Sequence, residues 1–213
     1  AKLLYRISQR KASIVFFQNN DDLKLFLENK LICSKKCKVI AGSGVNTNKF
    51  SRKRSADISK KFSFLFVGRL LYDKGILEYI KAIKILRVKH TDVTFEVLGP
   101  LYKNNATAVN QEALNTWVSE GIIKYLGETD NVQHFMETAD CIVLPSYREG
   151  LSKVLIEASS MSLPIVTTNV PGCRDVIIDK ETGFLCKVKN STDLADKMEK
   201  MILLPFIMIL VQD

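Results

Sequence analysis

The sequence is poor in the residues that build metal centres and disulfide frameworks. It has two histidines, one tryptophan and five cysteines in 213 residues. The cysteines are Cys33, Cys37, Cys141, Cys173 and Cys186. An odd, scattered set is typical of reduced cytosolic thiols, and Cys33 and Cys37 lie far from either histidine. We therefore expect a cytoplasmic protein with no metal ion and no cofactor.

A membrane-spanning run is also missing. The longest apolar stretch, Met201 to Val211, is interrupted by Pro205 and is shorter than the ~20 residues that cross a bilayer. No signal peptide opens the chain. The sequence predicts neither a secreted nor an integral membrane protein.

Acidic residues are fewer than basic ones, and the net charge is +8. The basic residues concentrate in the segments 52–54 and 60–61, which we interpret first as part of a solvated linker. A nucleic-acid partner is not expected, because the basic run has no interleaved aromatic residues. An anionic membrane surface is the remaining alternative partner for this segment.

Apolar runs and amphipathic segments alternate along most of the chain. We expect strands at 13–18, 38–41, 62–67, 93–98, 122–126, 141–144, 165–168 and 183–188. We expect helices from Asn20 or Asp21, which would cap the first, and at 75–89, 108–120, 131–139, 150–163 and 193–204. Alternating strands and helices predict an α/β fold with a doubly wound parallel sheet, Rossmann-like in form. The polar stretch 46–61 has the composition of an interdomain linker.

The segment Cys141 to Thr168 carries two carboxylates, Glu149 in a loop and Glu157 on the helix that follows. With a helix starting near Gly150, Glu157 would lie about 12 Å along the axis, on the polar side near Lys153. Free N–H groups at the start of that helix would favour an anion. A sugar joined to a diphosphate and a ribose has the matching pattern of hydroxyls, charge and hydroxyls.

A second loop follows the strand 62–67 and contains Arg69 and Lys74. In open α/β sheets ligands bind at the carboxyl ends of the strands, where both loops are expected. A guanidinium and an ammonium five residues apart suit a diphosphate. The alternative is a surface loop with two incidental cations.

Two motifs resemble a known family. The string R-E-G-L-S-K-V-L-I-E-A, residues 148–158, is similar to the E-x7-E signature of the retaining glycosyltransferases of family 4, which use nucleotide-sugar donors. The string V-G-R-L-x-x-D-K-G, residues 67–75, resembles the phosphate-binding segment of that family. The segments 146–150 and 169–175 resemble its bacterial surface-polysaccharide and lipid-linked branch, which tends to use UDP-sugars, often N-acetylhexosamines.

The resemblance implies a role for each matching residue. Arg69 and Lys74 would neutralise the donor diphosphate and stabilise it as it leaves, without a metal. Glu157 would bind the ribose hydroxyls, and Glu149 would face the transferred sugar. Donor-binding backbone would come from Gly99, Pro100, Leu126, Gly150, Leu151 and Ser152. The implied activity is retaining transfer of a sugar to a polysaccharide or lipid-linked acceptor, with peripheral association at the inner membrane face as a further hypothesis.

The resemblance also implies a domain organisation, the C-terminal half of the two-domain GT-B architecture. Residues 1–45 would be the end of the N-terminal acceptor domain with its hinge, and 46–61 the basic linker. Residues 62–204 would be the nucleotide-sugar-binding domain, and 205–213 an atypical apolar tail. By this resemblance, the bulk of the acceptor domain would be missing from this sequence.

Three alternatives remain open at this point. The chain could be a non-catalytic nucleotide-sugar-binding subunit, or an inactive remnant that needs a separate acceptor domain. It could also belong to a sugar-nucleotide epimerase of related architecture. The sequence does not give the donor sugar, the acceptor, the linkage or the oligomeric state.

Overall fold

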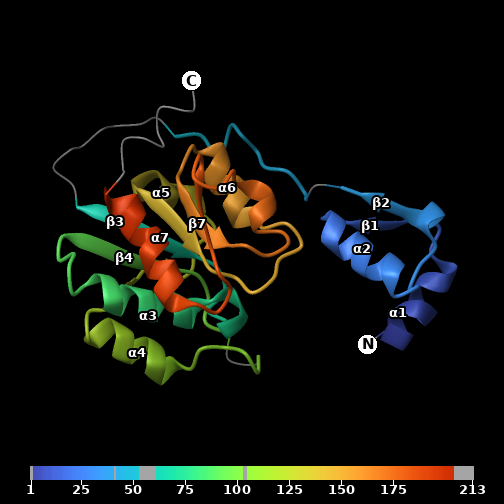
Figure 1. Cartoon of the computed structure of the whole chain (residues 1–213). Helices are drawn as coiled ribbons and strands as arrows, with labels where there is room; N and C mark the ends of the chain where they lie inside the picture. Colours follow the sequence, from blue (N-terminus) through green and yellow to red (C-terminus); the bar gives the residue numbers. More distant parts are fainter. Residues whose placement is uncertain (1, 41, 53–60, 103–104, 204–213) are drawn as a thin grey trace.

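A computed structural model of the chain describes residues 2–40, 42–52, 61–102 and 105–203. Figure 1 shows a small lobe, formed by residues 2–40, beside a large lobe that begins at strand β3. The predictions for the basic residues Lys53, Arg54 and Lys60 and for the tail 205–213 lie outside the described residues.

A six-stranded sheet with the order β5-β4-β3-β6-β7-β8 forms the centre of the large lobe. Its strands are β3 (Phe62–Val67), β4 (Val93–Leu98), β5 (Lys124–Tyr125), β6 (Cys141–Leu144), β7 (Ile165–Thr168) and β8 (Gly183–Cys186). All neighbouring pairs are parallel, and the strand order reverses between β3 and β6. The prediction of a doubly wound parallel sheet is confirmed, and the reversal places a ligand-binding crevice at the carboxyl ends of β3 and β6.

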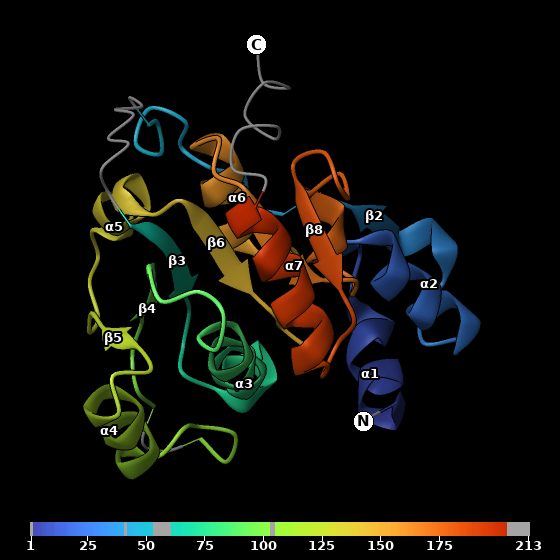
Figure 2. The same cartoon turned by 60° about the vertical axis from the view of Figure 1, so that its left-hand side comes forward.

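Helices cover both faces of this sheet. They are α3 (Ile76–Leu86), α4 (Gln111–Ser119), α5 (Val132–Thr138), α6 (Lys153–Ser160) and α7 (Ser191–Leu203). Helices α3 and α7 pack against each other on one face, and α5 and α6 lie on the other (Figures 1 and 2). The apolar faces of these helices pack on the central strands β3, β6 and β7, whose side chains are buried almost without exception, so the large lobe has a continuous apolar core.

The small lobe contains helix α1 (Lys2–Ser8), strand β1 (Val15–Phe17), helix α2 (Asn20–Glu28) and strand β2 (Cys37–Val39). Strands β1 and β2 pair in parallel and form a two-stranded sheet. Neither α1 nor α2, both fully described, contains a buried residue. The small lobe therefore has secondary structure but little interior.

Short 3-10 turns complete the list of elements. They are Gln9–Lys11, Ser34–Lys36, Tyr72–Lys74 and Arg174–Val176. The turn Tyr72–Lys74 lies in the loop after β3, and Gly75 ends it in a left-handed conformation with φ of 76°. A side chain at that φ is disfavoured, so a glycine suits the junction between this turn and α3.

Several predicted boundaries are wrong, and each has a local cause. Helix α6 begins at Lys153 and not near Gly150, because the Ser152 N–H bonds to the Gly172 carbonyl and Ser152 stays extended. Glu149 is therefore separated from the helix by a loop. Helix α4 begins at Gln111 and not at Ala108, because the Val109 N–H bonds to the Leu70 carbonyl.

The strand predicted at 122–126 is reduced to two residues. The N–H groups of Ile122 and Ile123 both point to the Trp117 carbonyl, at 2.8 and 3.4 Å, and so close the end of α4 instead of joining the sheet. Helix α2 is capped by Asn19, whose side chain accepts from the Asp22 N–H at 2.7 Å, and not by Asn20 or Asp21. Asn20 is already helical, and an N-cap must keep an extended backbone.

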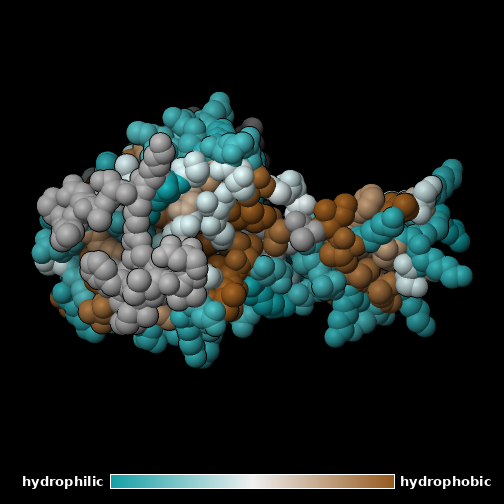
Figure 3. Space-filling view, turned by 90° about the horizontal axis from the view of Figure 1, so that it is seen from above, coloured by the Kyte–Doolittle hydropathy of each residue, from teal (hydrophilic) through white to brown (hydrophobic). Residues whose placement is uncertain are grey.

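Figure 3 shows the narrow connection between the lobes and apolar side chains on the surface of both. In the small lobe the exposed large apolar residues are Leu3, Leu4, Tyr5, Ile7, Ile14, Phe16, Leu25, Val39 and Ile40. Within the part of the chain that the structure describes, every helix is too short or too polar to cross a membrane.

Candidate active site

The loops after β3 and β6 meet at the carboxyl edge of the sheet. Lys74 Nζ lies 2.5 Å from Glu149 Oε1, which also accepts a hydrogen bond of 2.7 Å from Ser146 Oγ. Both side chains of the ion pair are largely buried, with exposed fractions of 18% and 14%. The structure thus brings together two of the predicted catalytic residues, whose opposite charges compensate each other.

Backbone contacts hold these two loops together. The Tyr147 N–H donates to the Asp73 carbonyl at 2.8 Å. A Cβ atom at Gly75 would lie 2.1 Å from the Pro145 carbonyl oxygen, so only glycine allows this approach. Lys74 and Glu149 are therefore fixed by backbone packing on both sides of their ion pair.

The remaining predicted nucleotide-binding backbone lies further along the same edge. The Gly99 N–H donates to the Gly127 carbonyl at 2.8 Å, and the Leu70 N–H donates to the Pro100 carbonyl at 3.0 Å. The Leu126 N–H bonds to the Val97 carbonyl and continues the edge beyond β5. Gly99, Pro100 and Leu126 thus form one wall at the ends of β3, β4 and β5.

Arg69 belongs to this wall and not to the ion pair. Its side chain is exposed, and its guanidinium carbon lies 5.8 Å from the centroid of the Tyr102 ring. Among the hydrogen bonds and ion pairs between described residues, none joins Arg69 to Glu149 or Lys74. An exposed arginine over an aromatic ring keeps its donors available to a ligand.

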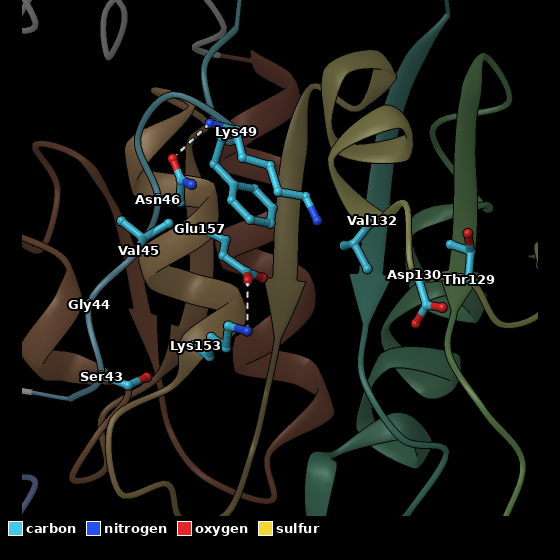
Figure 4. Close-up of a pocket in the computed structure, with 11 residues that line it drawn as sticks. Ser43, Gly44, Val45, Asn46, Lys49, Thr129, Asp130, Val132, Lys153 and Glu157 are labelled. Carbon is cyan, nitrogen blue, oxygen red and sulfur yellow. Dashed lines mark hydrogen bonds and ion pairs between the residues drawn. The ribbon is translucent and has the colours of Figure 1, made fainter.

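Glu157 faces a pocket of about 770 Å³ between helix α6, the loop 129–132 and the segment 43–50, which precedes the large lobe in the chain (Figure 4). Helix α6 contributes Lys153 and Glu157, whose side chains approach to 3.6 Å. The pocket is lined by Ser43, Gly44, Val45, Asn46, Lys49, Phe50, Thr129, Asp130, Val132, Lys153 and Glu157. Figure 4 shows the Glu157 carboxylate between Lys153 and the turn that carries Lys49.

Burial of Glu157 contradicts its expected place on the polar side of the helix. The residue is only 6% exposed, because the segment 43–50 and the loop 129–132 cover that face of α6. Burial raises the pKa of the Glu157 carboxyl, and the charges of Lys153 and Lys49 partly oppose this rise. A largely buried carboxylate that borders a pocket is a suitable acceptor for the hydroxyl of a bound ligand.

The pocket wall formed by Asn46, Lys49 and Phe50 was not predicted as part of a site. Asn46 Oδ1 accepts from the N–H groups of Asn48 and Lys49, both at 3.1 Å, and so shapes the turn. Phe50 is buried, and its carbonyl accepts from Ser160 Oγ at 2.7 Å. Phe50, a single apolar aromatic residue in an otherwise polar stretch, was the sequence signal that this part of the predicted linker packs against the large lobe.

The predicted anion cradle at Gly150 to Ser152 is partly engaged within the protein. The Ser152 N–H donates to the Gly172 carbonyl at 3.0 Å, and the Glu149 N–H donates to the Pro171 carbonyl at 3.2 Å. Gly150 and Leu151 lie between these two anchors. Among the described residues there is no cluster of three or more metal-binding side chains, and the expectation of a metal-free site stays a prediction.

Comparison with known proteins identifies the class of protein. The family model described as "Glycosyl transferases group 1" matches residues 47–208, which include the loops of Arg69, Lys74 and Glu149 and the helix of Glu157. The chain belongs to this family, and the family resemblance read from the two motifs is confirmed.

Individual relatives agree with this membership. The chain is 31% identical over 167 residues to the capsular polysaccharide biosynthesis glycosyltransferase CapM of Staphylococcus aureus, covering 74% of the chain and 41% of CapM. It is 29% identical over 210 residues to an N,N'-diacetylbacillosaminyl-diphospho-undecaprenol alpha-1,3-N-acetylgalactosaminyltransferase of Campylobacter jejuni, covering 93% and 54%. The chain thus spans about half the length of these relatives.

Solved structures support the fold. The structure of Anabaena Alr3699/HepE in complex with UDP and glucose superposes with a TM-score of 0.82 at 20% identity, over 99% of this chain and 62% of HepE. The structural neighbours are GT-B glycosyltransferases, so the prediction of a GT-B domain is confirmed.

Proposed function

We propose that the chain is the donor-binding half of a glycosyltransferase that transfers a sugar from a nucleotide-sugar, with retention of configuration. The observation that carries this proposal is the arrangement of two acidic sites on one loop–helix unit. Glu149 is paired with Lys74 at the sheet edge. Glu157, on the helix that follows the Glu149 loop, is buried and lines the pocket. These sites suit the two hydroxyl-rich ends of a nucleotide-sugar.

Each end of the donor has its own set of residues in this proposal. Glu157 accepts hydrogen bonds from the ribose hydroxyls inside the pocket, and Gly99, Pro100 and Leu126 line the nucleoside. Glu149 and the backbone of Gly150, Leu151 and Ser152 face the sugar.

Arg69 and Lys74 act on the diphosphate between these ends. The exposed guanidinium of Arg69 binds phosphate oxygens in pairs, and Lys74 moves from Glu149 towards the charge that develops on the leaving nucleoside diphosphate. Exchange of partners at Lys74 would also free the Glu149 carboxylate to accept hydroxyls of the sugar. Cationic side chains supply the compensating charge here without a metal ion.

A UDP-N-acetylhexosamine and a lipid-linked acceptor are the substrates that we propose. The Campylobacter relative is named for N-acetylgalactosamine transfer to a diphospho-undecaprenol-linked sugar, and HepE was solved with UDP. CapM is named for capsular polysaccharide biosynthesis. These names support a donor and acceptor class used in cell-surface glycan assembly. Association with the inner membrane face is part of our proposal.

Calorimetric titration of the chain with UDP, GDP and ADP, with magnesium and with a chelator, tests the donor site. We expect binding that selects one base and is equal in both conditions. UDP-N-acetylgalactosamine, UDP-N-acetylglucosamine and UDP-glucose would follow, to identify the nucleotide-sugar that binds most tightly. Absence of binding by every nucleotide would refute the donor-site proposal.

Variants at the cationic residues sharpen this test. Arg69→Ala should weaken UDP binding about tenfold or more, because one charge-assisted interaction stabilises by about 1.5–3 kcal/mol. The Arg69→Ala/Lys74→Ala double variant should bind more weakly still. A Lys81→Ala/Lys84→Ala variant on the outside of α3 loses the same charge and is the matched control, with UDP affinity expected to match the parent.

A further inference from the structure

The first turn of α2 in the small lobe is attached to the loop of Glu149 in the large lobe. Asn19 Nδ2 donates to the Gly150 carbonyl at 2.6 Å, across 131 positions of sequence. Asp22 forms an ion pair with Arg148, and Asp21 forms one of 2.7 Å with Arg174. We call these three contacts the α2 clamp.

Asn19 is the central residue of the α2 clamp. It is 4% exposed, and its side chain uses both polar atoms. Oδ1 caps α2 by accepting from the Asp22 N–H, while Nδ2 donates to Gly150 and to the Asp22 carboxylate at 3.0 Å. The start of the helix and the position of the loop are therefore set by one amide group.

The Gly150 backbone lies close to the small lobe. A Cβ atom at Gly150 would lie 2.0 Å from Oε1 of Gln18, the residue that precedes Asn19, although this flexible side-chain end can shift. On the opposite side, a Cβ atom at Gly172 would lie 2.4 Å from the Glu149 carbonyl oxygen. The loop that carries Glu149 is thus held between a segment of its own lobe and the start of α2.

The three contacts of the α2 clamp are unequal in strength. The side chains of Arg148 and Arg174 are 53% and 34% exposed, and ion pairs so open to water contribute little. The Asn19 amide is buried, and a buried polar group that loses its partner costs far more. Asn19 should therefore control the position of the loop, while the two arginines guide the approach of the lobes.

We infer that Asn19 is a positioning residue for the sugar end of the donor, acting through Gly150 on Glu149. This inference rests on the proposed function. Glu157 and its pocket are not contacted by the α2 clamp, whereas the Glu149 loop is part of it. Loosening the clamp should therefore weaken binding of the sugar and leave binding of the nucleoside diphosphate unchanged.

Asn19→Ser is the variant that tests this inference. Serine is a good N-cap, so α2 keeps its start, but the side chain is too short to donate to Gly150. Asn19→Asp also keeps the cap and has no amide donor. Asn29→Ser, at the far end of the same helix and bonded to the Leu25 carbonyl, is the matched control.

The measurement is the ratio of two affinities, for UDP and for the UDP-sugar that the parent binds most tightly. We expect UDP-sugar affinity to fall about tenfold in Asn19→Ser, a loss of about 1.4 kcal/mol, with unchanged UDP affinity. Asn29→Ser should leave both affinities unchanged. Equal affinities in the parent and in both Asn19 variants would overturn the inference, as would an equal loss for UDP and UDP-sugar.

Hydrogen exchange gives a second readout that needs no ligand. The Glu149 and Ser152 amides are bonded to Pro171 and Gly172, and they should exchange faster in Asn19→Ser while those of β3 do not. Unchanged exchange at Glu149 and Ser152 would contradict the positioning role. If the parent binds no nucleotide, the proposed function itself fails, and this outcome is distinct from a clamp that has no effect.

Discussion

The two lobes have the same kinds of elements and very different interiors. The large lobe buries four consecutive residues in each of β6 and β7 and a continuous stripe along α3. The small lobe buries only two large apolar side chains, Phe17 and Leu31. Phe16, the neighbour of Phe17 on the same strand, is 57% exposed. Regular secondary structure alone therefore does not indicate where the stability of this chain resides.

Separate expression of the two lobes should show the largest difference in stability between them. A fragment of residues 1–45 should be largely unfolded, because so little apolar area balances its chain entropy. A fragment of residues 46–213 should unfold cooperatively. Far-UV circular dichroism of the first and Trp117 fluorescence of the second, in urea, would measure this. A cooperative thermal transition in the small fragment would contradict the prediction.

Two phenylalanine substitutions compare the lobes within the intact chain. Phe66→Ala should lower the free energy of unfolding by about 3–5 kcal/mol, because the ring is fully buried against Tyr79. Phe16→Ala removes the same atoms from an exposed site and should change the free energy of unfolding by less than about 0.5 kcal/mol. Urea denaturation followed by Trp117 fluorescence gives both values. Similar losses in the two variants would show that the Phe16 face is covered in solution.

Thiol reactivity divides the lobes in the same way. Burial raises the pKa of Cys173 to about 11 and that of Cys186 to about 12. Cys33 is exposed in the small lobe, and Cys37 is half-buried there. At pH 8 iodoacetamide should modify Cys33 first and Cys37 more slowly, and the large-lobe cysteines only in urea. Mass spectrometry of peptides would detect the order, and early labelling of Cys173 would disprove it.

The smallest expected effect concerns Glu157 inside the large lobe. Its raised pKa means that ionisation costs more in the folded than in the unfolded chain, so stability falls as pH rises through these two pKa values. Glu157→Gln should therefore raise Tm slightly at pH 7 and weaken UDP binding. The difference in Tm should vanish below about pH 4, where the parent carboxyl is protonated in both states. Thermal scans at several pH values would check this sign.

The sequence predicted the sheet of the large lobe better than it predicted the site. Strands at 62–67, 93–98, 141–144 and 165–168 have the predicted bounds, because each is rich in β-branched and other apolar residues and ends at turn or polar residues. The length of the two-residue β5 was overestimated. The Ile122 and Ile123 side chains are buried as in a strand, while their N–H groups bond to the Trp117 carbonyl at the end of α4. Apolar spacing reports burial and does not report hydrogen-bond partners.

The candidate site depended on contacts that periodicity does not contain. The pairing of Lys74 with Glu149 requires that β3 and β6 be neighbours, which the structure shows. The alternation of elements predicted only that both loops lie at the carboxyl edge of the sheet. The covering of Glu157 by the turn at Asn46 to Phe50 does not follow, because a helical wheel places Glu157 on the polar face. The bond from Asn19 to Gly150 joins two lobes, and no local pattern could reveal it.

The interlocking of the loops after β3 and β6 has a consequence for engineering. Gly75 leaves no room for a side chain beside Pro145, and Asp73 bonds to the Tyr147 backbone. Because this fit is made by main chain, the two loops form a single transferable module. In a chimera with 68–75 from one parent and 145–152 from another, each loop would pack against a loop from a different protein. Donor specificity should be exchanged between relatives only by moving both loops together.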